Sequence, residues 1–332
     1  MQEKCKDPAG PTFMTSPRPN LFLVGAPRCG TTALFTYLST HPSVYMSSVK
    51  ELHYFSTDLY QPHPQASFAN EREYLAMFEG ATNEPWRGEA SPFYLYSTAA
   101  APAIKAFSPD ARVIITLRNP ADMMYSMYCL RVRAALFHPA QETAPSFEEA
   151  LAVGTARLRG ASLPPGAPTE PGRCLYLCYR ELGRYADRVE RFVNLFGRQA
   201  VHTVIFDDLV RDTTATYRDV CRFLAIDASI ETDFDLSLAH RAGGALPRSG
   251  RLARLLWRPP RPLARAVRAL VPEGARSSLR EKLQGWNDRR PPELRAETRR
   301  RLLDDCTPDV IRLSKMLDKD LTHWLRDERR EP

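Results

Sequence analysis

Residues 21–39, LFLVGAPRCGTTALFTYLS, constrain the fold more than any other stretch of the chain. Leu21–Val24 is a continuous apolar run with the length of a buried strand, and residues 31–38 carry apolar side chains at helical spacing. Gly25–Gly30 lies between them and has the glycines and proline of a tight loop. A strand, a glycine loop and a helix in this order direct backbone N–H groups and the positive end of the helix dipole at one point. The stretch therefore predicts a binding site for a phosphate-like anion.

The loop departs from the pattern of nucleotide triphosphatases at one decisive position. Gly25 and Gly30 have the spacing of G-x-x-x-x-G-K-[ST], but Thr31 stands where that pattern has lysine, and the basic residue is Arg28 inside the loop. In triphosphatases the lysine contacts the β- and γ-phosphates and the next hydroxyl binds Mg²⁺. The sequence therefore argues against a triphosphate–magnesium site. It favours a smaller anion held by Arg28, the loop amides and the hydroxyls of Thr31 and Thr32.

Cys29 raises a second possibility, because a thiol at a helix N-terminus can act as a nucleophile. A tyrosine-phosphatase loop has an arginine six residues after its cysteine, whereas this chain has Phe35 there. We therefore interpret Cys29 as a small residue that lines the loop.

Two further motifs follow the loop at short distance. His41-Pro42 comes after the predicted helix, and residues 50–55 read KELHYF. Together with R-x-G-T-T at 28–32, these motifs resemble the 5′-phosphosulfate-binding segment of sulfotransferases that use 3′-phosphoadenosine 5′-phosphosulfate (PAPS). The resemblance points to the bacterial branch related to heparan-sulfate and tyrosyl-protein sulfotransferases. The glycine loop alone would not be specific, whereas the combination is.

The resemblance extends over about residues 20–326 and implies a fold. It is an α/β, P-loop-like three-layer fold, in which helices flank a mostly parallel central sheet and the nucleotide binds at the carboxyl ends of the strands. The continuous apolar runs at 112–117 and 201–206 are typical of buried parallel strands. Other predicted elements are a short strand at 44–45, a helical patch at 74–78, helices over 99–107, from Pro120, over 147–153, over 175–196 with Gly197 as its end, and over 214–224, and a helical pair within 293–327.

Sulfuryl transfer is an in-line displacement at sulfur, so the acceptor must lose a proton while the leaving oxygen gains charge. The resemblance implies Glu51 as the base, Arg28 as the cation at the leaving oxygen, and His53 as a residue that positions the acceptor. By residue type alone, Glu51 could also be a surface carboxylate or the partner of Lys50. Some heparan-type relatives have an aspartate where this chain has Ser56, and this difference argues against a glucosamine-type acceptor.

A second substrate-side motif lies at 86–95, WRGEASPFYL, which resembles the family pattern G-E-x-(T/S)-P-x-Y. Glu89 is expected there as a supporting acid or an acceptor contact. The alternative is a strand-end residue that caps a turn.

The predicted strand at 112–117 leads into Arg118, and Ser126 follows eight residues later on the predicted helix. This spacing resembles the 3′-phosphate-binding segment of the family, and two helical turns allow both groups to face one pocket. A guanidinium binds a phosphate in a bidentate manner. The alternative for Arg118 is a strand-end salt bridge.

The net charge of +7 is unevenly distributed, because residues 241–332 contain 23 Lys/Arg against 13 Asp/Glu, or +10. Family members place in segment 240–292 a loop that holds the adenine and the 3′-phosphate, and Arg289 and Arg290 are our candidates for this role. The basic segment could instead be a solvated face, or a contact surface for an anionic acceptor or an anionic membrane.

Length and composition fit one large domain. The resemblance implies a single sulfotransferase domain at 20–326, with a flexible arm at 1–19, a tail at 327–332 and a mobile loop at 138–172 over the acceptor. The seven scattered cysteines indicate reduced thiols, and no apolar run approaches the ~18 residues of a membrane span. Residues 1–19 have no apolar core, so we expect neither a signal peptide nor the Golgi anchor that the animal members of the resembled family carry. We therefore expect a cytoplasmic, bacterial enzyme.

The sequence thus predicts transfer of a sulfuryl group from PAPS to a hydroxyl or amine of a small molecule, glycan or lipid, with no metal. A P-loop kinase of a small molecule and a non-catalytic nucleotide-binding protein are the alternatives. Lys50, His53 and Glu89 are the predicted substrate contacts. The predicted donor-binding residues are Ala26, Pro27, Arg28, Cys29, Gly30, Thr31, Thr32, Arg118, Ser126, Arg289 and Arg290.

Overall fold

The structure is a computed structural model that describes residues 18–60, 67–230, 234, 246–257, 259–262, 265 and 273–326. The tail at 327–332 lies outside the described residues, as do nearly all of the predicted arm and parts of the basic segment at 240–292.

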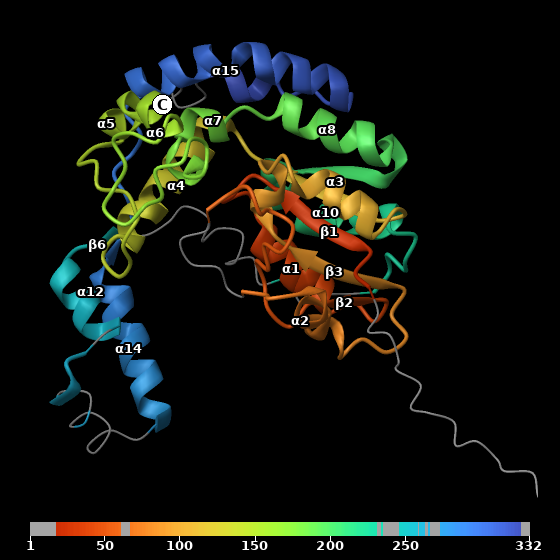
Figure 1. The fold of residues 1–332 in the computed structure, drawn as a ribbon, viewed down its shortest axis with the longest axis horizontal. Coiled ribbons are helices and arrows are strands. Elements are labelled where there is room, and N and C mark those ends of the chain that lie inside the picture. The colour runs from red at the N-terminus through yellow and green to blue at the C-terminus, as the bar shows by residue number, and fades with distance from the viewer. Residues whose placement is uncertain are drawn as a thin grey trace, which may run out of the picture.

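Five parallel strands form the central sheet, in the order β2-β3-β1-β4-β5 (Figure 1). The predicted parallel sheet is confirmed. The central strand is completely buried, because helices cover both of its faces, and this explains its continuous apolar sequence. The strands are β1 (Leu21–Gly25), β2 (Val44–Met46), β3 (Trp86–Ala90), β4 (Arg112–Leu117) and β5 (Val201–Ile205).

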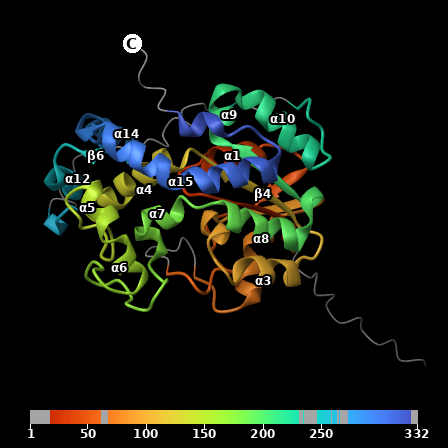
Figure 2. The ribbon, with the colours of Figure 1, turned by 90° about the horizontal axis from the view of Figure 1, so that it is seen from above.

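The two faces of the sheet carry separate hydrophobic cores. Phe22 and Val24 of β1 belong to the larger core, whereas Leu21 and Leu23 belong to the smaller one, as the alternation of side chains along a strand requires. Figure 2 shows the resulting layers, with α1 and α10 on one side of the sheet and α3 and α8 on the other. These four helices are α1 (Thr31–Ser39), α3 (Ala100–Phe107), α8 (Ala186–Phe196) and α10 (Thr213–Phe223).

The remaining elements surround this three-layer body. The other helices are α2 (Glu71–Leu75), α4 (Pro120–Ala134), α5 (Phe147–Ala152), α6 (Gly154–Leu158), α7 (Tyr179–Leu182), α9 (Phe206–Arg211), α12 (Gly250–Trp257), α14 (Glu273–Asn287) and α15 (Ala296–Leu317). A small antiparallel pair joins β6 (Leu246–Pro247) to β7 (Asp288–Arg289). Short 3-10 turns lie at Ala76–Phe78, Pro92–Leu95, Leu175–Leu177, Arg198–Ala200 and Thr322–Leu325.

The single helix predicted over 175–196 is wrong, because the chain forms a 3-10 turn, then α7, and then α8. Gly183 lies at the break, where a Cβ atom would come within 2.1 Å of the Met124 side chain on α4. Asp309 then accepts hydrogen bonds from the backbone N–H groups of Tyr185 and Ala186 at the start of α8. The apolar spacing continues through the break, so periodicity could not reveal it. Gly197 ends α8 as predicted.

The prediction of a helical pair within 293–327 is also wrong. One 22-residue helix, α15, continues through Pro308, and only a 3-10 turn follows it. Proline inside a helix costs about 3 kcal/mol. Leu302, Cys306, Val310 and Leu313 are buried against the core on both sides of it, and this packing offsets the local cost.

The segment at 138–172, predicted to be a mobile loop, contains α5 and α6. A buried ion pair between Arg157 and Glu142, 2.7 Å apart, anchors it, and the Tyr179 hydroxyl donates a further hydrogen bond to Glu142. Among the described residues, no helix combines the length and the apolar character that crossing a bilayer requires.

Gly25 ends β1 at a point of very close backbone approach. Its φ is +137°, and a Cβ atom there would lie 2.4 Å from the carbonyl oxygen of Thr116 on β4. We predict that Gly25→Ala lowers the melting temperature by about 5 °C or more, because strain and overlap add. Gly154→Ala is the matched control, since a Cβ atom there meets nothing within 4 Å. Equal melting temperatures for the two variants would contradict this prediction.

Candidate active site

The glycine loop is held open by unusual backbone angles. Gly30 caps α1 with a φ of 83°, and a Cβ atom there would lie 2.7 Å from the Leu209 side chain, so only glycine fits. Arg28 also has a positive φ, of 65°, although it is not glycine. Such a backbone angle costs on the order of 1–3 kcal/mol and is typical of functional sites.

Arg28 contacts two predicted donor-binding residues that lie far away in the sequence. Its Nε donates a hydrogen bond to Ser126 Oγ over 3.1 Å, and its carbonyl oxygen accepts one from Arg118 Nη1 over 3.3 Å. The Arg118 guanidinium also lies 4.6 Å over the Phe206 ring. Burial, together with the charge of Arg118, lowers the pKa of Arg28 to about 10. Two neighbouring cations of this kind favour an anionic ligand.

A cavity of about 360 Å³ lies directly at the loop. Glu51 enters it from the segment after β2, so the predicted base and the predicted anion loop face the same space. Apolar walls come from Pro92, Phe93 and Leu130, and Arg131 adds a cation. The predicted residues that line the cavity are Pro27, Arg28, Gly30, Thr31, Thr32 and Glu51.

Ala26 and Cys29 do not line this cavity with their side chains, because both are completely buried in the larger core. The Cys29 thiol donates to the Pro27 carbonyl oxygen over 3.4 Å, and burial raises its pKa well above the ordinary value. A thiolate nucleophile therefore does not fit this environment. Only the backbone of these two residues is available to a ligand.

Glu51 is partly exposed and is held by two basic neighbours. Its carboxylate lies 2.6 Å from Lys50 Nζ and 3.8 Å from His53 Nε2. Burial acts to raise the pKa of Glu51, but the interactions with His53 and Lys50 outweigh it and keep the pKa well below the usual range. The side chain is therefore an ionised carboxylate. Glu51 pairs with Lys50 and also lines the cavity, so its role as the base stays a prediction.

The backbone around Glu51 is fixed by β3 and the turn after it. Glu51 and His53 have positive φ angles of 64° and 54°. The Glu51 N–H donates to the Ala90 carbonyl oxygen over 2.9 Å, and the His53 N–H donates to Ser91 Oγ over 3.1 Å. These bonds orient both side chains.

Glu89 does not contact the acceptor directly, which corrects that expectation, because its side chain is completely buried. Its carboxylate accepts hydrogen bonds from the hydroxyls of Tyr74, Ser91 and Tyr94. Burial outweighs these bonds and raises the pKa of Glu89 to about 7. Since Ser91 also accepts the bond from the His53 N–H, Glu89 supports the segment that presents Glu51 and His53.

The family model for the sulfotransferase domain matches residues 18–242, more than half of the chain. The chain belongs to the sulfotransferase domain family. The crystal structure of a sulfotransferase from Alicyclobacillus acidocaldarius is 28% identical in sequence, superposes with a TM-score of 0.68, and covers 93% of this chain and 100% of its own.

Curated relatives of this sulfotransferase-family chain are larger proteins. The bifunctional heparan sulfate N-deacetylase/N-sulfotransferase 1 of Mus musculus is 27% identical over 329 residues, which cover 93% of this chain and 31% of that protein. The carbohydrate sulfotransferase 15 of Homo sapiens is 30% identical over 149 residues, 33% of this chain and 27% of that protein. The membrane-associated sulfotransferase kil1 of Dictyostelium discoideum is 34% identical over 114 residues, 33% of this chain and 22% of that protein. The chain therefore spans less than a third of the length of these relatives.

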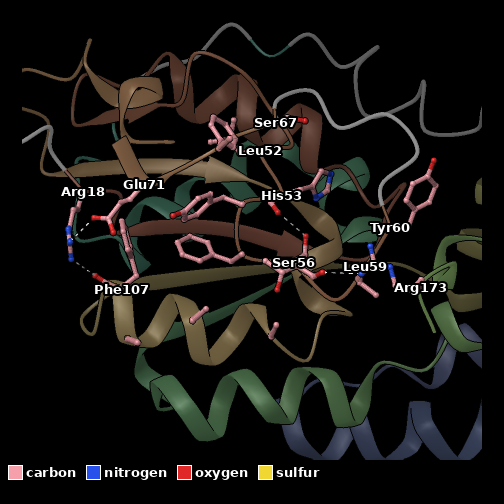
Figure 3. Close-up of a pocket in the computed structure, with 17 residues that line it drawn as sticks. Arg18, Leu52, His53, Ser56, Leu59, Tyr60, Ser67, Glu71, Phe107 and Arg173 are labelled. Carbon is pink, nitrogen blue, oxygen red and sulfur yellow. Dashed lines mark hydrogen bonds and ion pairs between the residues drawn. The ribbon is translucent and has the colours of Figure 1, made fainter. Parts of the chain in front are cut away.

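A second cavity of about 880 Å³ lies next to the predicted base and is lined by His53 but not by Glu51. Figure 3 shows Tyr60 and Arg173 near His53 at one end of this cavity, and Arg18 and Phe107 at the other. The His53 side chain is only 6% exposed, and its Nδ1 has no hydrogen-bond partner within the described part of the chain. His53 thus lines the larger cavity, and it also contacts Glu51, which lines the smaller one.

A third cavity of about 1,000 Å³ lies beyond Arg118 and is lined by charged residues of both signs. Asp207 accepts a hydrogen bond from Trp324 Nε1 over 2.6 Å there. Among the residues that the structure describes, no group of three or more histidine, cysteine, aspartate or glutamate side chains could hold a metal ion.

Arg289 and Arg290 come directly after Asp288, a residue that lies beside α4. Asp288 lies 3.4 Å from Arg133, and the Tyr125 hydroxyl donates to the Pro292 carbonyl oxygen over 2.6 Å, so residues 288–292 run beside the helix that carries Ser126. Both arginines are exposed, and neither lines any of the three cavities described. Their role as nucleotide contacts stays a prediction.

The basic segment also presents an apolar stripe on α14. Leu279, Leu283 and Trp286 follow each other at helical spacing and are 48%, 37% and 66% exposed. Twelve Lys/Arg against three Asp/Glu lie between residues 246 and 290. Contact of this segment with an anionic acceptor or membrane stays a prediction.

Arg131 is the charged residue of this cavity that the sequence analysis did not predict. It lies five residues after Ser126 in no motif, and only the folded chain brings it to the cavity that Glu51 lines. A guanidinium on the helix after the 3′-phosphate motif was its only sequence signal.

The raised pKa of Glu89 makes stability depend on pH. Its protonated form is favoured by folding, so this contribution is fully present below about pH 4.5 and is lost as the pH rises through about 7. Glu89→Gln cannot ionise, so we predict that it gains about 3 kcal/mol of unfolding free energy relative to wild type between about pH 5 and pH 8. Urea titrations at both pH values measure this, with the exposed Glu79→Gln as control. The same difference at both pH values would contradict the prediction.

Proposed function

We propose that this chain is an enzyme that transfers a sulfuryl group from PAPS to a hydroxyl or amine of an acceptor. The observation that carries the proposal is that Arg28 and Glu51 line one cavity, where they would serve as the cation at the leaving oxygen and the base for the acceptor. Membership of the sulfotransferase domain family supports it.

The charges around the loop fit such a donor. Arg28, Thr31 and Thr32 with the loop amides would hold the 5′-phosphosulfate. Arg118 and Ser126 would hold the 3′-phosphate, because both contact Arg28 and lie at the carboxyl end of β4 and on the helix that follows. PAPS supplies the activated sulfuryl group and a phosphate leaving group.

Different side chains remove the proton from the acceptor and neutralise the charge on the leaving oxygen. Glu51 takes the proton of the attacking hydroxyl or amine, since its carboxylate is ionised and faces the cavity. The new bond forms between the acceptor atom and sulfur as the bond from sulfur to the phosphate oxygen breaks. Arg28 neutralises the charge on that oxygen. Lys50 and His53 orient Glu51.

We propose a glycan as the acceptor, because the curated relatives include a heparan sulfate N-sulfotransferase and a carbohydrate sulfotransferase. A small-molecule kinase is not favoured, since Thr31 stands where ATP-dependent P-loop enzymes have lysine.

The proposal predicts that Glu51→Gln lowers transfer at least about 100-fold without weakening the donor, because general-base catalysis contributes about 10²–10⁴-fold. The measurement is transfer of ³⁵S from labelled PAPS to a panel of glycans, amino sugars and lipids, together with calorimetric binding of adenosine 3′,5′-bisphosphate (PAP). Glu79→Gln, an exposed glutamate on the surface, is the control.

Full transfer by Glu51→Gln would show that another group is the base. Binding of PAP by the wild type without label transfer to any acceptor would favour a non-catalytic nucleotide-binding protein.

A further inference from the structure

Arg131 is a cation in the cavity that the proposed reaction does not use. It extends from α4 and lines the cavity together with Arg28 and Glu51. Its guanidinium lies 5.0 Å from the centre of the Tyr176 ring, and its Nη1 donates to Gln141 Oε1 over 3.4 Å. Within the described part of the chain, no carboxylate forms an ion pair with it.

Among the described residues, two buried donors at or next to Arg131 have no acceptor, although Gln141 itself does not line the cavity. Arg131 Nε is one, and the Nε2 of Gln141, whose side chain is almost completely buried, is the other. Because Gln141 Oε1 accepts from Arg131, the amide orientation is fixed and Nε2 must point elsewhere. Buried polar groups are nearly always satisfied, so a partly satisfied guanidinium on a residue that lines a cavity points to a ligand in that cavity.

The chemistry of the neighbours indicates which ligand this is. A guanidinium prefers a carboxylate, sulfate or phosphate oxygen, and binds it in a bidentate manner. The anionic groups of the donor already have Arg28, Arg118 and Ser126 as their proposed partners. Arg131 shares its cavity with Glu51, which is where the reacting group of the acceptor must lie. Leu130 and Phe93 line the same cavity and shield these groups from solvent.

We propose that Arg131 binds an anionic group of the acceptor, a carboxylate or a sulfate ester, close to the atom that receives the sulfuryl group. The preferred acceptors would then be acidic saccharides. This inference rests on the proposed function, since it needs an acceptor beside Glu51. Arg131 would determine specificity and would take no proton.

The test uses matched sugars that differ in one group. Methyl β-D-glucuronide, methyl 6-O-sulfo-β-D-glucoside and methyl β-D-glucoside are titrated by NMR into the full chain saturated with PAP, and binding of PAP and PAPS is measured separately. We expect at least one charged sugar to bind about tenfold more tightly than the neutral one, and the comparison of the two charged sugars separates carboxylate from sulfate recognition. Arg131→Gln should abolish this preference and leave the affinities for PAP and PAPS within about twofold. Arg131→Lys keeps the positive charge and should retain part of the preference for charged sugars.

Arg222→Gln is the charge-matched control, because Arg222 is 64% exposed on α10 and pairs with Asp219. Melting temperatures of all variants show whether each is folded, and Arg131→Lys carries the test if Arg131→Gln does not fold. Equal binding of the three sugars, no binding of either charged sugar, or an unchanged preference in Arg131→Gln would overturn the inference. Weaker PAPS binding by Arg131→Gln would also overturn it and would make Arg131 a donor contact. Loss of PAP binding by the wild type would instead contradict the proposed function itself.

Discussion

The pairing of β1 with β4 is the constraint on which the site depends. Their register places Gly25 opposite Thr116, so the glycine loop and the Arg118 turn leave the sheet side by side. Only this adjacency allows Arg28 to reach Ser126, 98 residues away in the sequence, and Arg118 to reach the Arg28 carbonyl oxygen. The absence of a side chain on Gly25 permits the close approach. Strand pairing thus converts two distant sequence motifs into one anion-binding corner.

Three residues at or beside this corner have strained backbone angles. Arg28, Glu51 and His53 all have positive φ angles, which non-glycine residues adopt rarely. The end of β3 supports two of them, through the Ala90 carbonyl oxygen and Ser91 Oγ. Buried Glu89 holds Ser91 in turn, so a residue that touches no ligand fixes the position of the base. This arrangement is preorganisation, since the strain is offset by contacts within the fold.

The sequence predicted those parts of the molecule that depend on local patterns. Continuous apolar runs identified β1 and β4, and the spacing of Arg28, Thr31 and Glu51 within motifs identified residues that line one cavity. The break at Gly183 escaped, because apolar periodicity continues across it and only packing against Met124 requires it.

Two features of the site depend on contacts between residues that lie far apart in the sequence. No local sequence pattern encodes such contacts. The burial of Glu89 follows from the convergence of Tyr74 and Tyr94 on its carboxylate. The surroundings of Arg131 follow from the positions of Gln141 and Tyr176, which come from separate segments and contact its guanidinium without neutralising it. Residue spacing and composition do not carry this information. Only the folded structure shows that Glu89 supports the segment of Glu51 and that Arg131 lines the same cavity as Glu51.

The central claim is that the glycine loop with Arg28 receives a 3′-phosphorylated, sulfated nucleotide and not a triphosphate with magnesium. Calorimetric titration of the full chain with PAP and, separately, with ATP and Mg²⁺ tests it most directly. One PAP should bind per chain, at least about tenfold more tightly than ATP with Mg²⁺. Equal or tighter binding of ATP with Mg²⁺ would contradict the claim.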